Sequence, residues 1–233
     1  MIHATKTSPF IYLAALMAIL VLASCKKDNG GQPDGGEGVR DIDGNHYDTV
    51  TMGTQVWMTE NLKTTKYNDG TSIPTGLSDE AWRTTKTGAY AIYDNNAAND
   101  AAYGKLYNWY AVNSGKLAPK GWHVATIDDW NDLFRYLGGN GRVIGGKMKA
   151  TTGWNSPNTG ADNSSGFSAL PGGFRSWAGR YNLMGKNAYF WTTKEYLPPS
   201  DYAWYIVLFH DNAEIYSSSE YKMQGMSVRC VKD

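Results

Sequence analysis

The clearest periodic pattern of apolar side chains lies at residues 127–137. Apolar residues recur there at positions i, i+3, i+4 and i+7, on one helical face: Trp130, Leu133, Phe134 and Leu137. Thr126 stands at the favoured N-cap position, and Asp128 and Asp129 lie in the first turn, where the helix dipole favours anions. Two glycines at 138–139 provide a stop signal. The pattern predicts an amphipathic helix packed on a core.

Shorter patterns predict strands on both sides of this helix. Residues 39–62 read as a hairpin, because Asp43-Gly44 is a turn signal, residues 46–52 are rich in β-formers, and residues 55–58 return after a glycine. Further strands are predicted at residues 89–93, 188–193, 202–209, 213–217 and 226–231.

The last predicted strand alternates in character. Met226, Val228 and Cys230 share one face, and Arg229 points to the other. We therefore expect a half-buried antiparallel strand with Arg229 on its polar side.

Residues 150–181 are dense in Gly, Asn, Ser and Pro, and they predict a long loop. Short antiparallel strands, one or two helices and long ordered loops are typical of an α+β fold. No linker-like segment interrupts the chain after its start, so we expect one domain at residues 39–233.

An apolar run at residues 10–22 predicts an export signal at residues 1–24. Its 13 residues are too few for a membrane span, which needs about 20. The run ends in Leu22-Ala23-Ser24-Cys25, which resembles the lipobox of bacterial lipoproteins and implies that Cys25 carries the lipid that anchors the chain to a membrane. An ordinary secretory signal with an incidental Cys25 is the alternative.

Residues 25–38 follow as a flexible tether, with five glycines and nothing to bury. Bacterial sorting typically retains lipoproteins with Asp after the lipidated cysteine, and Lys26 stands there instead. We therefore expect the chain at the outer membrane, with the periplasmic or extracellular face left open.

Composition narrows the classes of function. Hydrophobic residues make up 42% and charged residues 19% of the chain, enough to form a core. Lys plus Arg and Asp plus Glu both total 22, so no basic excess exists to neutralise phosphates. A dedicated nucleic-acid binder is not expected.

Five separated motifs resemble one family, the Fibrobacter succinogenes major paralogous (FISUMP) domain. The motifs are TQVWMTENL at 54–62, YGKLYNW at 103–109, PKGWHV at 119–124, GFSALPGG at 166–173 and SVRCV at 227–231. The resemblance implies a C-type-lectin-like fold related to that of formylglycine-generating enzymes, on exported and surface proteins. It implies no particular reaction or ligand.

One departure from the family concerns cysteine. Members usually carry a Cys just before the Pro-x-Gly-Trp-His segment, which the resemblance would pair with the C-terminal Cys, but Ala118 stands there. We therefore expect Cys230 to be an unpaired, buried thiol. A disulfide of this kind typically adds about 2–4 kcal/mol to the free energy of unfolding, and packing must replace that contribution.

Residues with catalytic potential do not form a recognisable set. The four histidines are scattered: His3, His46, His123 and His210. No spacing matches a metal site, the single thiol cannot supply a cysteine pair for formylglycine-type oxidation, and Asp128-Asp129 is explained as helix capping. We expect no enzyme activity, no catalytic or metal-binding residues and no cofactor. An enzyme with dispersed catalytic residues is the weaker alternative.

An oxygen-rich cluster at Asp94, Asn95, Asn96, Asn99 and Asp100 has the ligand type that Ca²⁺ prefers. Asx-rich turns form without a metal, so the pattern leaves calcium binding open.

The best candidate binding residues lie at 172–181. Trp177 and Tyr181 offer flat rings for sugars, and Arg175 and Arg180 offer hydrogen-bond donors. The alternative is that these rings pin the loop onto the sheet.

The sequence thus predicts a lipid-anchored, surface-exposed, non-enzymatic domain that binds a glycan or a surface protein. A structural or assembly component of a cell-surface complex, with no small-molecule ligand, is the alternative.

Overall fold

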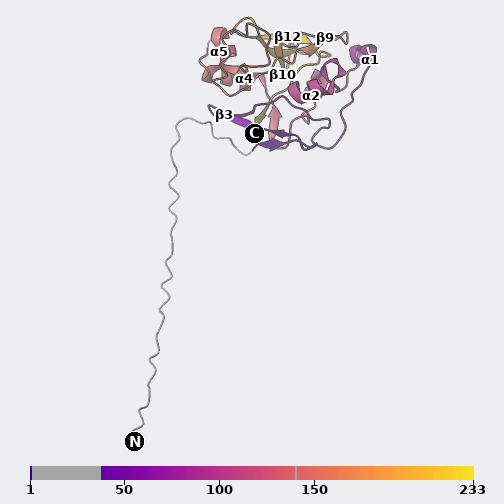
Figure 1. Ribbon diagram of the computed structural model, residues 1–233. Helices are drawn as coiled ribbons and strands as arrows, with labels where there is room; N and C mark the ends of the chain where they lie inside the picture. Colours follow the sequence, from indigo (N-terminus) through magenta and orange to yellow (C-terminus); the bar gives the residue numbers. More distant parts are fainter. Residues whose placement is uncertain (2–37, 140) are drawn as a thin grey trace. The chain divides into compact units, whose positions relative to one another are not determined.

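The computed structural model describes Met1 and residues 38–139 and 141–233 (Figure 1). The expected signal peptide at 1–24 apart from Met1, Cys25 as the expected site of lipidation, and all of the expected tether except Gly38 lie outside the described residues. From Gly38 onward the described chain forms one unit with an α+β architecture. No helix among the described residues combines the length and the apolar character needed to cross a bilayer.

A four-stranded antiparallel sheet joins the beginning and the end of this unit. Its order is β3-β4-β13-β7, with the C-terminal strand between two earlier ones. The strands are β3 (Thr49–Met52), β4 (Gln55–Met58), β7 (Trp122–Val124) and β13 (Cys230–Lys232).

The hairpin expected at residues 39–62 is two consecutive hairpins. β1 (Val39–Arg40) pairs with β2 (His46–Tyr47), and β3 then pairs forward with β4. The expected strand 46–52 is therefore interrupted at Asp48, because its two halves have different partners.

A three-stranded antiparallel sheet forms the second layer, in the order β10-β11-β12. Its strands are β10 (Asn187–Glu195), β11 (Tyr202–Phe209) and β12 (Ile215–Tyr221). The pattern located β11 correctly but placed β12 too early, at 213–217. Ala213 instead accepts a hydrogen bond from Gly146, and the strand continues through polar serines that carry no apolar signal.

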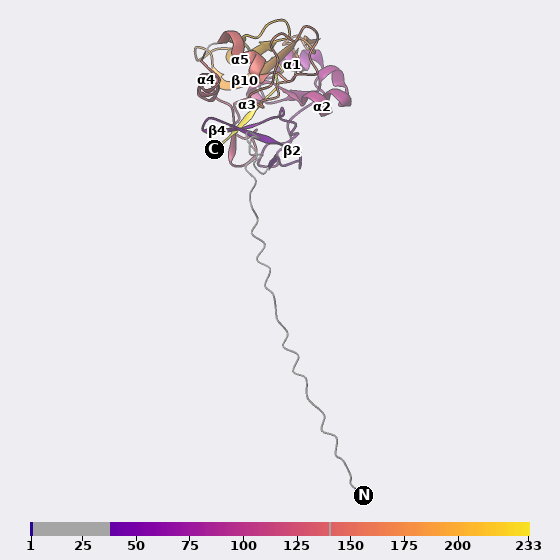
Figure 2. The same ribbon diagram turned by 60° about the vertical axis from the view of Figure 1, so that its left-hand side comes forward.

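Two short pairs complete the strands. β5 (Tyr90–Ala91) pairs with β6 (Leu106–Tyr107), and β8 (Phe174–Arg175) pairs with β9 (Tyr181–Asn182). Figures 1 and 2 both show β2, β3 and β4 at one end of the unit, and α1, α5 and β10 toward the other.

The described residues contain more helices than the one or two expected. They are α1 (Asp79–Thr84), η1 (Tyr93–Asn95, a 3₁₀ turn), α2 (Ala97–Tyr103), α3 (Trp109–Val112), α4 (Ile127–Tyr136) and α5 (Gly141–Met148). The first three α-helices have seven residues or fewer, too short for a helical period to show. Their first turns are capped by the side chains of Ser78, Asn96 and Asn108. The sequence did not predict α5, because three of its eight residues are glycine, which has a low helix propensity.

α4 confirms the sequence prediction. Thr126 and Asp129 form a reciprocal capping box, Leu137 is the C-cap, and Gly138 and Gly139 follow with positive φ. Trp130 packs among Trp57, Phe167 and Phe190, with ring centroids 4.9–5.5 Å apart. These four rings fill the space between α4 and the two sheets.

Arg229 corrects one expectation about the strand predicted at 226–231, of which only residues 230 and 231 belong to β13. It alternates away from Met226, Val228 and Cys230 as predicted, but all four side chains are buried. The Arg229 guanidinium donates to the carbonyls of Met58 (2.9 Å), Phe167 (2.8 Å) and Ser168 (3.2 Å) and to the Asn61 side chain (2.8 Å). The segment 166–168 covers the face that was expected to be polar, so this end of the chain is buried on both sides.

Cys230 is buried and has no disulfide partner in the described chain, as expected. Burial raises the pKa of its thiol, so it remains protonated and unreactive in the folded protein. Ala118 packs in the same buried cluster.

We predict that Leu133→Ala destabilises the domain by about 2–5 kcal/mol, because Leu133 is fully buried against the aromatic cluster. The matched control is Asn131→Ala, on the exposed face of α4, which should change the free energy of unfolding by less than about 0.5 kcal/mol. Urea unfolding measures both. Equal losses would contradict this packing.

Candidate functional site

The expected binding segment forms a tight hairpin between β8 and β9. Arg175 pairs with Tyr181, the Ser176 N–H donates to the Arg180 carbonyl (2.7 Å), and the Gly179 N–H donates to the Ser176 carbonyl (2.9 Å). These bonds close the turn over residues 176–180. The position of Trp177 in this turn is therefore fixed by backbone hydrogen bonds on both sides of it.

Arg175 is not a surface donor, which corrects the sequence-based assignment. Its side chain is buried, and its guanidinium donates to the carbonyls of Gly179 (3.0 Å) and Leu77 (3.1 Å) and to the Asp79 carboxylate (3.1 Å). It also lies 4.5 Å from the centre of the Trp82 ring. Arg175 fastens the hairpin onto α1 and the segment just before it.

Gly179 allows the hairpin to approach α1 closely. Its φ is +87°, and a Cβ added there would lie 2.1 Å from the Asp79 carboxylate. A side chain at this position would push the hairpin off the helix.

Trp177 is the exposed ring of the hairpin. Its side chain is 42% exposed, and its backbone N–H donates to the Gln224 side chain (3.0 Å). No side-chain hydrogen bond of Trp177 occurs within the described residues. The ring meets Tyr221 edge-on at 6.1 Å, and Tyr221 packs on Tyr202 at 4.5 Å. We call Trp177, Tyr202 and Tyr221 the three-ring surface.

The side chains of the two tyrosines of the three-ring surface also interact with each other. This interaction raises the pKa of the Tyr202 hydroxyl to about 12, so Tyr202 remains protonated at neutral pH. Sequence analysis missed both tyrosines, because only the pairing of β11 with β12 brings them beside the hairpin.

Tyr181 and Arg180 differ in their exposure to solvent. Tyr181 is half-buried, its hydroxyl donates to the Asn95 side chain (3.2 Å), and its ring packs 5.2 Å from Tyr93. It therefore supports the base of the hairpin. Arg180 is exposed next to the turn, and it remains a candidate donor.

The oxygen-rich cluster at 94–100 serves local structure. Asn96 caps α2 by accepting from the Ala98 N–H (3.0 Å), and Asn99 donates to the Tyr93 carbonyl (3.0 Å). Asp100 receives two hydrogen bonds from the Lys105 ammonium. In the part of the chain that the structure describes, no three His, Cys, Asp or Glu side chains are grouped to hold a metal ion.

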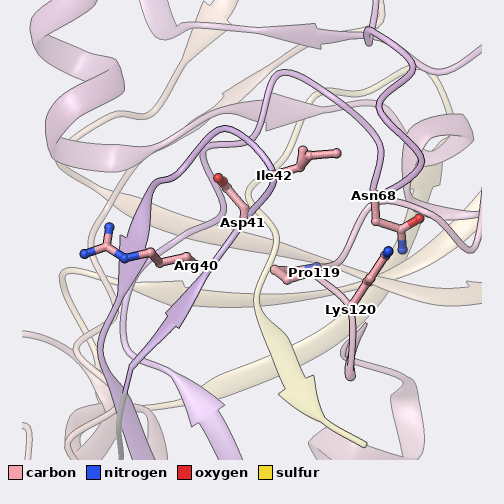
Figure 3. Close-up of a pocket in the computed structure, with 6 residues that line it drawn as sticks. All are labelled: Arg40, Asp41, Ile42, Asn68, Pro119 and Lys120. Carbon is pink, nitrogen blue, oxygen red and sulfur yellow. The ribbon is translucent and has the colours of Figure 1, made fainter.

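A pocket of about 300 Å³ lies near the start of the described chain, lined by Arg40, Asp41, Ile42, Asn68, Pro119 and Lys120 (Figure 3). The Asp41 carboxylate already accepts from the Tyr47 hydroxyl (2.6 Å) and from three donors of Asp43 and Asn45. In Figure 3, the Arg40 and Lys120 side chains extend in different directions. The pocket therefore lacks a convergent set of groups for chemistry or for capturing an anion.

A second hollow, of about 440 Å³, contains charges that are already paired. Lys116 bonds to Asp69 (2.8 Å), and Lys86, at the rim, bonds to Asp201 (3.2 Å). The hydrogen bond from Lys116 holds the pKa of the Asp69 carboxyl below its usual range.

His123 bridges two carboxylates at the edge of the four-stranded sheet. Its Nδ1 lies 2.8 Å from Asp233 and its Nε2 lies 3.1 Å from Asp129, which also belongs to the α4 capping box. Burial by itself lowers the pKa of His123, but the hydrogen bonds to Asp233 and Asp129 outweigh it, and the pKa is raised. The imidazole therefore links β7 to α4 and to Asp233, the residue after β13, which is a structural role.

Comparison with known proteins gives one family. The family model described as the Fibrobacter succinogenes major domain matches residues 50–232. No curated protein and no solved structure matches the chain.

We predict that the stability contributed by His123 depends on pH. Because the folded pKa is raised, the contribution is complete below the unfolded value of about 6.5 and is lost as pH rises through the folded pKa. His123→Gln should therefore cost more in urea unfolding at pH 5.5 than at pH 8.5. Asp233→Asn, which removes one carboxylate partner, should reduce the same pH dependence; a cost for His123→Gln that is constant with pH would refute the assignment.

Proposed function

Because the chain belongs to the Fibrobacter succinogenes major domain family, we propose that it is a lipid-anchored, non-enzymatic binding domain displayed at the outer membrane. It holds a glycan or a surface protein through the turn of the β8–β9 hairpin. Within this proposal the domain has a C-type-lectin-like fold. The α+β architecture, with short antiparallel strands and a long ordered stretch between α5 and β8, supports that fold.

The lipid anchor rests on the sequence of residues 10–25, which lie outside the described residues. Cys25 carries the lipid, and the tether to residue 38 holds the domain clear of the head groups. The described part begins beside β1 and β2, at the end of the unit away from α1, which supports the hairpin (Figures 1 and 2). In this proposal, Trp177 is accessible to a ligand on the side of the domain away from the membrane.

The observation that carries the binding proposal is the exposed Trp177 ring on a hairpin fixed by buried contacts. An exposed indole loses little conformational entropy on binding when its backbone is already immobilised. Arg175 and Gly179 provide that immobilisation without occupying the surface. Trp177 therefore combines an accessible ring with a rigid support. If the ring only held the loop onto the sheet, it would not need to be accessible.

The three-ring surface fits the apolar face of a sugar ring. Trp177 offers its exposed ring, and the neighbouring Tyr221 and Tyr202 carry hydroxyl groups that can bond to the hydroxyls of a sugar. Arg180 adds a guanidinium for a hydroxyl or an anionic substituent. A protein partner would use the same rings as anchors.

We predict that Trp177→Ala abolishes binding while changing the free energy of unfolding by less than about 1 kcal/mol, since the ring is partly exposed. The measurement is a glycan array and a surface-protein pull-down, with melting temperature as the fold check. Tyr136→Ala removes another exposed ring, on α4 (58% exposed against 42% for Trp177); it is the control and should bind normally.

If Trp177→Ala lowers the free energy of unfolding by about 3–5 kcal/mol, the ring instead serves to hold the loop onto the sheet. If the wild-type protein binds no glycan and no surface protein, the binding proposal fails, and the structural or assembly component is the better account.

Cys25→Ala should move the protein from the detergent-extracted membrane fraction to the soluble or unprocessed pool, because it removes the acylated side chain. Western blotting of fractionated cells measures this, and Cys230→Ala is the matched cysteine control. Unchanged fractionation of Cys25→Ala would exclude the lipid anchor.

A further inference from the structure

Within the described residues, no strand pairs with the outer side of the edge strand β12. On the other edge of the sheet, β10 is covered by bridges from Gly173 to Ala188 and from Phe190 to Ser227. β12 runs for seven residues in unbroken register with β11, with no proline, lysine or bulge. Natural edge strands usually carry one of these features, which prevent pairing with another chain.

The hydrogen bonds around β12 identify which main-chain groups point outward. The Lys222 N–H donates to the Asp201 carbonyl (2.8 Å). The main-chain groups of every second residue from 222 back to 216 therefore point toward β11. The main-chain groups of Tyr221 point outward: its N–H donates to the Glu220 carboxylate (2.9 Å) and its carbonyl accepts from the Gln224 N–H (2.9 Å). Ser217 and Ser219 share this outward phase.

The main chains of Ser217 and Ser219 have no hydrogen-bond partner on that side within the described residues. The other outward residue, Ile215, is approached by α5, where a Cβ on Gly141 would lie 3.4 Å from its carbonyl oxygen. Two N–H groups and two carbonyls, on residues two positions apart, thus form a short open edge. Ser217, Ser218 and the neighbouring Tyr216 are exposed around it.

We propose that β12 pairs antiparallel with β12 of a second copy of this chain, about a two-fold axis at Ser218. In this register Ser217 of one copy faces Ser219 of the other, and the open groups of both copies form four main-chain hydrogen bonds. The two three-stranded sheets become one continuous six-stranded sheet. The interface is isologous, as in most dimers.

The side chains of β12 fit this self-pairing. Glu220, its one charged residue, faces Tyr216 of the other copy, so no like charges meet. A hollow of about 320 Å³, lined by Gly141, Arg142, Glu214, Ile215 and Tyr216, lies where the partner strand must pass α5. Another extended peptide could bond to the same main-chain groups. It would not reproduce the pairing of Glu220 with Tyr216 on both sides of a two-fold axis.

The test uses the mature lipoprotein in its membrane, with Ser218→Cys. Residues on the axis form a non-hydrogen-bonded pair with Cα atoms about 4.5 Å apart, a geometry that suits a disulfide. Mild oxidation should give a covalent dimer on a non-reducing gel. Background is low, because Cys230 is buried and Cys25 is acylated in the proposed form.

Two cysteine controls define the surface and the register. Asn131→Cys, on the exposed face of α4, should remain monomeric. Ser219→Cys should cross-link far less than Ser218→Cys, because residue 219 faces residue 217 of the partner. Equal cross-linking of both serine variants would overturn the register, and no cross-linking of Ser218→Cys would overturn the dimer.

A second measurement avoids oxidation. Ser218→Lys places two ammonium groups opposite each other, and it should weaken the dimer about tenfold or more in sedimentation experiments on the detergent-solubilised protein. Asn131→Lys adds the same charge elsewhere and should leave the dimer unchanged. Melting temperatures confirm that both variants are folded. A wild-type protein that is monomeric at all concentrations refutes the proposal, and a dimer insensitive to Ser218→Lys places the interface elsewhere.

Discussion

The buried guanidinium of Arg229 is the interaction on which the rest of the domain depends. It carries a positive charge in the interior with no carboxylate bonded to it, and three main-chain carbonyls and one side-chain amide oxygen stabilise that charge. Burial lowers the pKa of Arg229 to about 9, so it stays charged at neutral pH. The acceptors belong to Met58 at the end of β4, to Asn61 just after it, and to residues 167–168, so they come from two segments far apart in sequence. Removing the guanidinium would leave buried acceptors unpaired in several segments at once.

Lys149 repeats this arrangement at the other side of the long loop. Its ammonium donates to the carbonyls of Thr159 (2.8 Å), Phe209 (2.9 Å) and Asn212 (2.9 Å), and burial lowers its pKa to about 8. The ammonium has three N–H donors, one for each carbonyl. Two buried cations thus order residues 150–170, which contain almost no regular secondary structure. Charge–dipole contacts replace the ladder hydrogen bonds that order a helix or sheet.

These contacts also explain what the sequence could and could not predict. α4 and β11 were predictable, because their patterns are local and repeat over eight or more residues. α1, α2 and α3 were not, because side-chain caps and tertiary packing, rather than periodicity, hold them. The alternation along residues 226–230 predicted the direction of Arg229 but not its burial, since the covering segment comes from residues 166–168. In the candidate site, the sequence of residues 172–181 was sufficient to identify Trp177, whereas Tyr202 and Tyr221 required the strand pairing. Arg175 was misassigned because its partners include Leu77 and Asp79, which are distant in sequence.

Cys230 is the single cysteine of residues 39–233, and its burial in an apolar cluster has a consequence for biogenesis. A domain held by a structural disulfide must meet an oxidant before it is stable, and its yield then follows the redox potential of the compartment. This domain has no such step. Its folding equilibrium is independent of the thiol–disulfide poise around it, so it reaches the same state in reducing and in oxidising surroundings.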